Sequence, residues 1–331
     1  MKILKERPQG TLPLIASFEG QEFFRRPGKR DVEMYISEPY GGIQENTGIM
    51  IVSHNWGGTW EMCSSWCDIL SSKFNLICVS VNYLQSGSSW REYCPTYDHG
   101  VLQSVDCLRA LYHIRKFLTE KGIRINFRRT YASGASGGGN ISQMLNKFAP
   151  RTFGCIIDLC GMAKLSRETA LGLQVLNAGY SEDPEAENYL TSAMQEIRDI
   201  GNPAHLKLQF AANPENKIVI VHGVDDDSCV CHEKVQAFAN MIKAGFQPDG
   251  HFITPGMVDG IIVTTTTHQV GDRPYVIAKF GQPYLSEKGD FVKLAPEEDD
   301  FTRKHSVIYP CTGGRYKIDF STIPTISFEK E

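Results

Sequence analysis

From about residue 30 to residue 285, the chain alternates between short, unbroken apolar runs and longer stretches with apolar residues at helical spacing. The helical spacing is clearest over residues 101–122, where Gly122 ends the pattern. Unbroken apolar runs of this length predict buried strands; they include "NLICVSVNY" (75–83), "FGCIIDLCGMA" (153–163) and "KIVIVHGV" (217–224). Strands alternating with helices predict an α/β fold, with a mostly parallel central sheet and helices on both faces.

The same reading assigns the other elements of this sheet. Further strands are expected at "VEMYISEP" (32–39), "GIMIVSHNWGG" (48–58), "RTYASGASGG" (129–138) and, as the last strand, "HFITPG" (251–256). Helices are expected at "NISQMLNKF" (140–148), "HEKVQAFANMIKAGF" (232–246) and, as the last helix, "PYVIAKFGQPYL" (274–285). These elements together predict one α/β domain over residues 1–285.

Two stretches break the alternation. Residues 162–214 carry two or three helix-like segments between consecutive strands, which predicts a helical insertion after the sixth strand, either a cap or an extension of the surface. Residues 286–331 are charged at first and then rich in turn residues. Gly313 and Gly314 stand there between two β-like runs, so we expect a C-terminal extension with a β-hairpin.

Composition narrows the classes of partner. The 331 residues are 41% hydrophobic and carry a formal net charge of −4 without a basic run, which argues against a nucleic-acid-binding surface. The chain shows neither a secretory signal nor eighteen consecutive apolar residues, so we expect a cytoplasmic protein with no membrane partner. Its oligomeric state is left open.

The spacing of the cysteines argues against a metal-binding site. None of the ten has C-x-x-C spacing, and the group Cys229, Cys231 and His232 lacks a second ligand pair. Reduced thiols of a cytosolic protein are the simpler interpretation. We expect no metal and no organic cofactor.

The stretch "YASGASGGGN" (131–140) carries the strongest chemical signal. Its Gly134-Ala135-Ser136-Gly137-Gly138 matches G-x-S-x-G between a strand and a helix, where a sharp turn lifts the serine hydroxyl above the sheet. The neighbours two residues away must be small to fit that turn. A Walker loop would need G-K-[ST], and a dinucleotide loop would follow an early strand. A flexible glycine loop remains the alternative.

An isolated serine is a poor nucleophile, so Ser136 requires a base and an orienting acid later in the chain. Asp226 in "VHGVDDD" ends a buried strand, and His268 in "TTTTHQVGDR" lies in a polar turn before the last helix. The neighbouring carboxylates of Asp225 and Asp227 compete for the role of acid. The rival bases are His251, at the start of the last expected strand, and His305 in the charged tail.

With three motifs in this order at the ends of the expected elements, the chain resembles the α/β-hydrolase superfamily from about residue 30 to residue 285. It is similar to the branch of acetylxylan esterases and prolyl oligopeptidase catalytic domains. Segments such as "EIRDIGNPAHLK" and "HFITPGMVDG" also resemble bacterial hydrolase-like proteins found near flagellar glycosylation genes.

The resemblance implies a Ser136 nucleophile and a His268 general base, and its HG-x-x-D spacing selects Asp226 as the acid. It also implies an oxyanion hole made by the N–H groups of Gly137 and Trp56, although Asn55 stands where the family usually has glycine. His54 and His222 match positions that are more often structural than catalytic.

The substrate is the least defined part. Asn55, Trp56, Trp60 and Trp90 lie in loops expected beside the nucleophile, where the tryptophans could line an acyl pocket, stack on a sugar or pack beneath the insertion. We predict a serine hydrolase that cleaves a carboxylic ester of a small molecule, with an acylated carbohydrate suggested by the resemblance. A peptidase, a thioesterase or a non-catalytic binding protein of the same fold are the alternatives.

Overall fold

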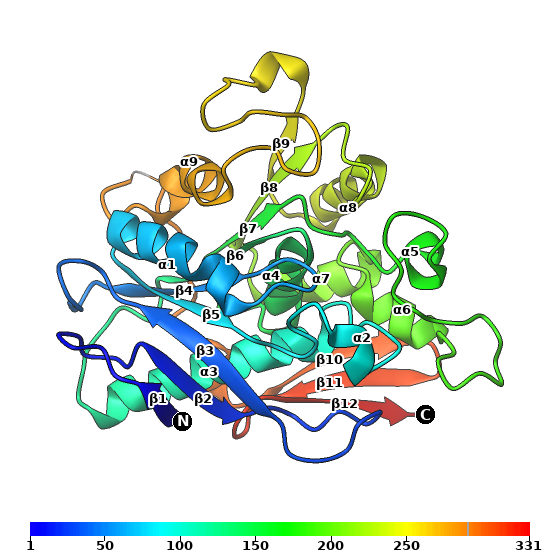
Figure 1. Cartoon of the computed structure of the whole chain (residues 1–331), viewed down its shortest axis with the longest axis horizontal. Helices are drawn as coiled ribbons and strands as arrows, with labels where there is room; N and C mark the ends of the chain where they lie inside the picture. The colour runs from blue at the N-terminus through cyan, green and yellow to red at the C-terminus, as the bar shows by residue number, and fades with distance from the viewer. Residues whose placement is uncertain (290) are drawn as a thin grey trace.

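The computed structural model of the chain describes residues 1–289 and 291–331 and is built around a nine-stranded sheet (Figure 1). The strand order is β1-β2-β3-β5-β4-β6-β7-β8-β9. Strands β4 to β9 pair in parallel, whereas β1, β2 and β3 form an antiparallel edge. The strands are β1 (Lys2–Lys5), β2 (Ile15–Glu19), β3 (Asp31–Ser37), β4 (Gly48–Ser53), β5 (Leu76–Val81), β6 (Thr130–Ala135), β7 (Cys155–Leu159), β8 (Lys217–Gly223) and β9 (Asp249–Ile253).

Helices cover both faces of the sheet, as predicted for this fold class. One face carries α1 (Trp60–Phe74) and α9 (Arg273–Leu285). The other carries α3 (Val101–Glu120), α4 (Gly137–Phe148), α7 (Pro203–Ala212) and α8 (Cys231–Ala244). Shorter elements are α2 (Trp90–Tyr93), α5 (Arg167–Leu171), α6 (Ser192–Arg198), η1 (Pro255–Met257) and α10 (Asp300–Arg303).

The central strands are buried on both faces, which explains their unbroken apolar sequences. Along β4, Ile49 and Ile51 join the core under α3 and α4, while Met50 and Val52 join the core under α1 and α9. This alternation follows from the two-residue period of a strand. It fixes the register that brings the ends of β4, β6, β7 and β8 to one edge of the sheet.

The C-terminal hairpin is present and is extended by a third strand. β10 (Ser306–Cys311) and β11 (Gly314–Asp319) pair across the predicted turn, and β12 (Thr325–Lys330) adds to β11. This small antiparallel sheet packs against α3, α6 and α7, outside the helical layer (Figure 1).

Several elements differ from those expected. Strands β1 and β2 and helix α1 were not predicted. The insertion follows the seventh strand, β7, rather than the sixth, with β1 and β2 preceding the five strands expected before residue 162. The last strand, β9, begins at Asp249, so His251 is its third residue rather than its first. No helix among the described residues is both long and apolar enough to cross a membrane.

Candidate active site

Ser136 lies on a strained corner between β6 and α4. β6 ends at Ala135, α4 begins at Gly137, and Ser136 between them has φ 58° and ψ −121°. A non-glycine residue with positive φ costs free energy and is held there only by its surroundings. A Cβ on Gly138 would lie 2.1 Å from the Ser53 carbonyl oxygen, so this position of the motif excludes any side chain.

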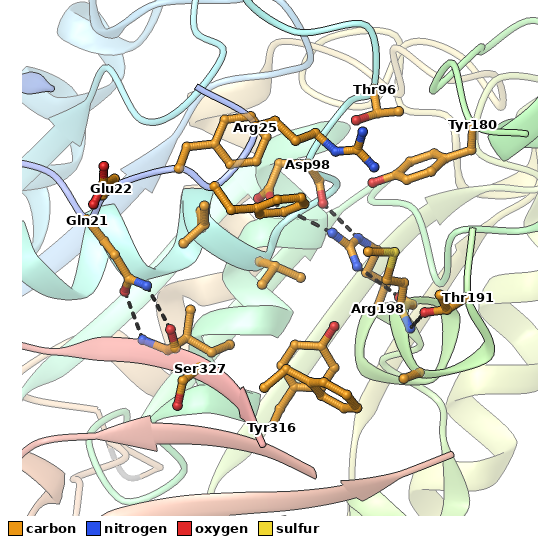
Figure 2. A pocket seen from close by; sticks show the side chains of 18 of the residues that line it. Gln21, Glu22, Arg25, Thr96, Asp98, Tyr180, Thr191, Arg198, Tyr316 and Ser327 are labelled. Atoms are coloured by element: carbon orange, nitrogen blue, oxygen red, sulfur yellow. Dashed lines mark hydrogen bonds and ion pairs between the residues drawn. The ribbon is translucent and has the colours of Figure 1, made fainter. Parts of the chain in front are cut away.

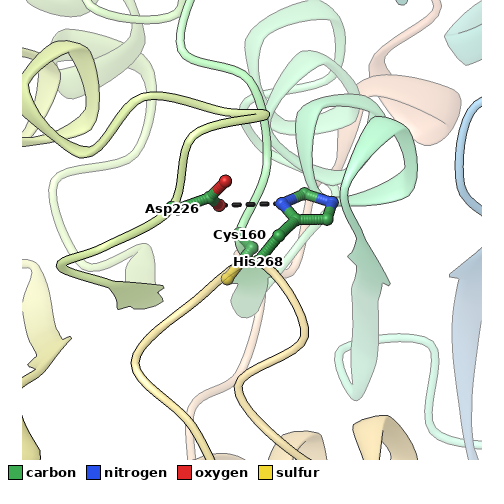
Figure 3. Close-up of side chains that lie close together, drawn as sticks. All are labelled: Cys160, Asp226 and His268. Atoms are coloured by element: carbon green, nitrogen blue, oxygen red, sulfur yellow. Dashed lines mark hydrogen bonds and ion pairs between the residues drawn. The ribbon is translucent and has the colours of Figure 1, made fainter. Parts of the chain in front are cut away.

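Asp226 and His268 come from different loops and meet beyond the same edge of the sheet. Asp226 follows β8, and His268 lies in the loop between η1 and α9. The His268 Nδ1 lies 2.8 Å from the Asp226 Oδ2, so the protonated ring nitrogen donates a hydrogen bond to the carboxylate (Figure 3). That hydrogen bond leaves Nε2, on the far side of the ring, to take up a proton.

The carboxylate of Asp226 is held from its other side by backbone. Its Oδ1 accepts hydrogen bonds from the N–H groups of Ser228 (3.0 Å) and Cys229 (2.8 Å). Burial alone would raise the pKa of Asp226. The hydrogen bond and charge of His268, together with the Cys229 N–H and His222, outweigh burial and lower the pKa. Asp226 is therefore ionised and can stabilise the imidazolium that forms when His268 takes up a proton.

The competing residues are engaged elsewhere. Asp225 and Asp227 are exposed and contact Thr266 and Ser228 rather than His268. Of the rival bases, the His251 Nε2 lies 3.2 Å from Asp249 and that of His305 lies 3.7 Å from Asp300. Of the three adjacent aspartates, only the buried Asp226 meets a histidine that could serve Ser136.

The Ser136 hydroxyl and His268 are not joined by a hydrogen bond in this structure, although both residues are described. Such a bond is often long or poorly aligned without substrate and tightens in the substrate complex. His268 is partly exposed, with 19% of its side chain accessible, so its ring is not fully enclosed by the protein.

The predicted oxyanion donors lie side by side. A Cβ added to Gly137 would lie 2.8 Å from the backbone nitrogen of Trp56, which brings the β4 loop against the start of α4. The Gly137 N–H belongs to the first turn of α4, where N–H groups have no partner within the helix. Two backbone donors at a helix N-terminus form a suitable place for negative charge.

Trp56 is part of an aromatic cluster. Its ring stacks on Tyr97 with centroids 3.7 Å apart and meets Trp90 edge-on at 5.6 Å. The insertion packs on this cluster through Leu165 and Tyr180, among other residues. Trp56 and Trp90 are thus at least partly packing residues beneath the insertion, which was one of the predicted roles.

The other two residues predicted to bind substrate lie differently. Trp60 is outside the cluster just described and stacks on Tyr35, with centroids 5.5 Å apart, at the start of α1. Asn55 is half-buried beside Trp56, and its side-chain Oδ1 is buried without a hydrogen-bond partner among the described residues. The unpaired Oδ1 of Asn55 lies beside Gly58 in the loop that carries Trp56, whereas Trp60 serves the packing of α1.

Cys160, which lies in the apolar run 153–163 expected as a buried strand, is a neighbour of the site. It follows β7 with φ 49°, and its sulfur lies with the Asp226 and His268 ligand atoms in a group spanning no more than 4.8 Å (Figure 3). These three residues are types that can bind a metal ion. However, the 2.8 Å between the His268 Nδ1 and the Asp226 Oδ2 is a hydrogen-bond distance, which is too short for two ligands of one tetrahedral zinc ion. The sequence feature that could have predicted this position is that Cys160 directly follows a strand, β7, which pairs with β6.

The two histidines expected to be structural are both fully buried. His54 packs on Tyr83, and its Nε2 lies 2.8 Å from the Ser86 hydroxyl. The Nε2 of His222 lies 2.7 Å from the Cys229 carbonyl oxygen and 3.4 Å from the Asp226 Oδ2. Burial lowers the pKa of each histidine to about 4, so both are neutral near pH 7.

Comparisons with known proteins agree with this architecture. A model of the prolyl oligopeptidase family (Peptidase_S9) matches residues 76–254, more than half of the chain. No curated protein sequence matches. Among solved structures, an acylaminoacyl peptidase from Pyrococcus horikoshii is similar with a TM-score of 0.58 and 14% identity, over 83% of this chain and 42% of that one.

Two further peptidases show the same fold. Dipeptidyl peptidase 4 from Porphyromonas gingivalis gives a TM-score of 0.57 and 15% identity, over 81% of this chain and 35% of that one. A puromycin-hydrolyzing peptidase from Mycobacterium tuberculosis gives a TM-score of 0.53 and 15% identity, over 86% of this chain and 42% of that one. The chain spans about two fifths or less of the length of these peptidases.

Proposed function

Because the chain belongs to the prolyl oligopeptidase family and has the α/β-hydrolase fold, we propose that it is a serine hydrolase that cleaves carboxylic esters through an acyl-enzyme on Ser136. The observation that carries the assignment of residues is the 2.8 Å hydrogen bond from His268 to the buried Asp226, beyond the sheet edge at which Ser136 lies. An acid and a histidine so arranged are the machinery that a serine nucleophile needs.

In the proposed reaction, the Nε2 of His268 takes the proton of the Ser136 hydroxyl as its oxygen attacks the carbonyl carbon of the substrate. The resulting oxyanion accepts hydrogen bonds from the N–H groups of Gly137 and Trp56. His268 then gives its proton to the leaving alcohol, and the acyl group stays on Ser136. A water molecule, deprotonated by His268, then attacks the acyl carbon. The bond from that carbon to the Ser136 Oγ breaks, His268 returns the proton to Oγ, and the carboxylic acid leaves. Asp226 holds the ring orientation and stabilises the imidazolium in both halves.

The substrate class is a small acylated molecule, and an acylated carbohydrate is the case suggested by the resemblance to acetylxylan esterases. Asn55 supports a polar substrate group at the loop that carries Trp56, because its buried Oδ1, beside Gly58, lacks a partner within the described part of the chain. Peptide cleavage is the second candidate, and it is favoured by the family match and by the peptidases of similar fold.

A matched pair of substrates separates the two candidates. The p-nitrophenyl ester and the p-nitroanilide of one acyl-amino acid differ only in the bond to be cleaved. We expect the ester to be turned over and the anilide to be cleaved at least about 1000-fold more slowly, with both rates absent in Ser136→Ala. Comparable kcat/KM on the two would favour the peptidase. Equal rates for wild type and Ser136→Ala would contradict catalysis by Ser136.

A further inference from the structure

A cavity of about 400 Å³ lies outside the candidate active site (Figure 2). It forms where three segments beyond the parallel sheet meet: the loop after β2 (21–25), the insertion (residues 180 and 191–198) and the C-terminal strands β11 and β12. Ser136, Asp226 and His268 are not among its lining residues. A cavity of this volume suits a small organic ligand.

The three walls are tied together by specific hydrogen bonds. The Gln21 side chain pairs with the edge strand β12, donating to the Ile326 carbonyl oxygen at 2.7 Å and accepting from the Ile326 N–H at 2.8 Å (Figure 2). The Arg25 Nη1 donates to the Glu187 carbonyl oxygen in the insertion at 2.8 Å. The cavity is therefore built by contacts that join distant parts of the chain, rather than left between loosely packed loops.

Most of the lining is apolar, and one buried cation interrupts it. Rings and aliphatic side chains cover the walls; they include Phe24, Val101, Leu102, Tyr316 and Phe328. The cation is Arg198, which is only 6% exposed. Its guanidinium faces the cavity, and the hydroxyl of Tyr316 approaches it (Figure 2).

The Arg198 guanidinium keeps donor capacity for a ligand. Its Nε donates to the Asp98 carbonyl oxygen at 2.8 Å and its Nη1 to the Met194 carbonyl oxygen at 2.9 Å. Its Nη2 lies 3.7 Å from the Asp98 Oδ1, beyond hydrogen-bond distance. The Oδ2 of the same carboxylate is occupied by the N–H of Gln103 at 3.0 Å. An arginine has five N–H donors, so Nη2 can serve a further anion.

The charges on the lining favour an anion. Three cations, Arg25, Arg198 and Lys330, face two carboxylates, Glu22 and Asp98. We propose that this cavity binds an amphipathic monocarboxylate of the fatty-acid type. The carboxylate binds the Nη2 of Arg198 beside the Tyr316 hydroxyl, and the apolar chain lies along the aromatic walls.

The site is separate from the catalytic one but shares a wall with it. Thr96 and Asp98 line the cavity, whereas Tyr97 between them stacks on Trp56, the proposed oxyanion donor. The Tyr97 carbonyl oxygen accepts the Tyr180 hydroxyl at 3.0 Å on the cavity side. The ligand would therefore lie behind the aromatic cluster rather than against Ser136.

Isothermal titration of the full chain with decanoate and with decyltrimethylammonium tests the proposal, because the two amphiphiles share chain length and differ in charge. We expect decanoate to bind at one site and at least tenfold more tightly than the cation. Arg198→Gln should weaken decanoate about 10- to 100-fold, the range for a lost charge-assisted hydrogen bond. The matched control Arg124→Gln removes an exposed arginine that does not line the cavity and should leave binding unchanged.

Two further measurements test the proposal if Arg198→Gln fails to fold. Ala193→Phe places a ring in the cavity and should abolish binding. Protein whose Ser136 carries a fluorophosphonate adduct should bind decanoate as before. Equal binding of the two amphiphiles, or unchanged binding in Ala193→Phe, would overturn the proposal. Loss of binding after labelling would also overturn it, because decanoate would then occupy the acyl pocket.

Discussion

Asp226→Asn is the change whose effect the geometry defines most fully. The Oδ1 of Asp226 accepts two backbone N–H groups, from Ser228 and Cys229, so an asparagine will keep its carbonyl oxygen at that position. Its NH₂ group then takes the place of Oδ2 and points at the Nδ1 of His268. Two donors cannot share a hydrogen bond, so His268 must carry its proton on Nε2 instead.

That tautomer cannot accept the proton of Ser136, and the imidazolium also loses its buried counter-charge. The same exchange in a serine protease triad lowers kcat by about 10⁴, because the geometry persists while the tautomer is wrong. We expect a similar loss here, equivalent to about 5.5 kcal/mol of transition-state stabilisation. Because both backbone hydrogen bonds survive, the melting temperature should change by no more than a few degrees.

The assay is the initial rate on a p-nitrophenyl ester, corrected with Ser136→Ala, alongside Asp225→Asn and Asp227→Asn as matched controls. These neighbours are exposed and do not contact His268, so each should keep at least half of the activity. The reasoning is refuted if Asp226→Asn retains a tenth or more of wild-type kcat. It is equally refuted if one of the neighbouring variants is the more damaging.

Three other predictions concern strain, packing and proton linkage. A glycine at position 136 adopts the positive φ without strain, whereas an alanine does not. In urea titrations, the free energy of unfolding of Ser136→Gly should therefore exceed that of Ser136→Ala by about 1 kcal/mol. Equal free energies of unfolding would show that the corner is unstrained. Gly138→Ala places a Cβ 2.1 Å from the Ser53 carbonyl oxygen and should lower the free energy of unfolding by about 3 kcal/mol. The control Gly256→Ala places its Cβ in open space and should change the free energy of unfolding by less than about 0.5 kcal/mol. Similar changes in the two variants would contradict the packing argument. His54 has its pKa lowered by burial to about 4, so below pH 6.5 only the unfolded chain binds its proton, and stability is lost as the pH falls. Relative to His54→Gln, the wild type should therefore lose about 2 kcal/mol of unfolding free energy between pH 7.5 and 5.0, and a difference that does not change with pH would show that folding leaves the pKa of His54 unchanged.

The features that the sequence predicted well are those with a local physical cause. The elbow around Ser136 is encoded by glycines that nothing else can replace at that corner. The central strands were predicted because burial on both faces leaves an unbroken apolar run. Helix α1 was missed although Cys63, Trp66 and Leu70 follow a helical spacing and are buried.

The parts that could not be predicted depend on contacts between distant segments. Tyr97 stacks on Trp56 only because the loop after β5 lies over the loop after β4. The pairing of Gln21 with Ile326 joins residues 305 positions apart. Cys160 meets Asp226 and His268 only after β7 and β8 are side by side. No pattern of period 2 or 3.6 carries such information.

Intact mass after treatment with a fluorophosphonate, on wild type and Ser136→Ala in parallel, tests the central claim most directly. The probe labels an activated serine without requiring the natural substrate. We predict a single adduct on the wild type and none on the variant. An unlabelled, folded wild type would contradict an activated Ser136, and an adduct on both proteins would assign the reactive group to another residue.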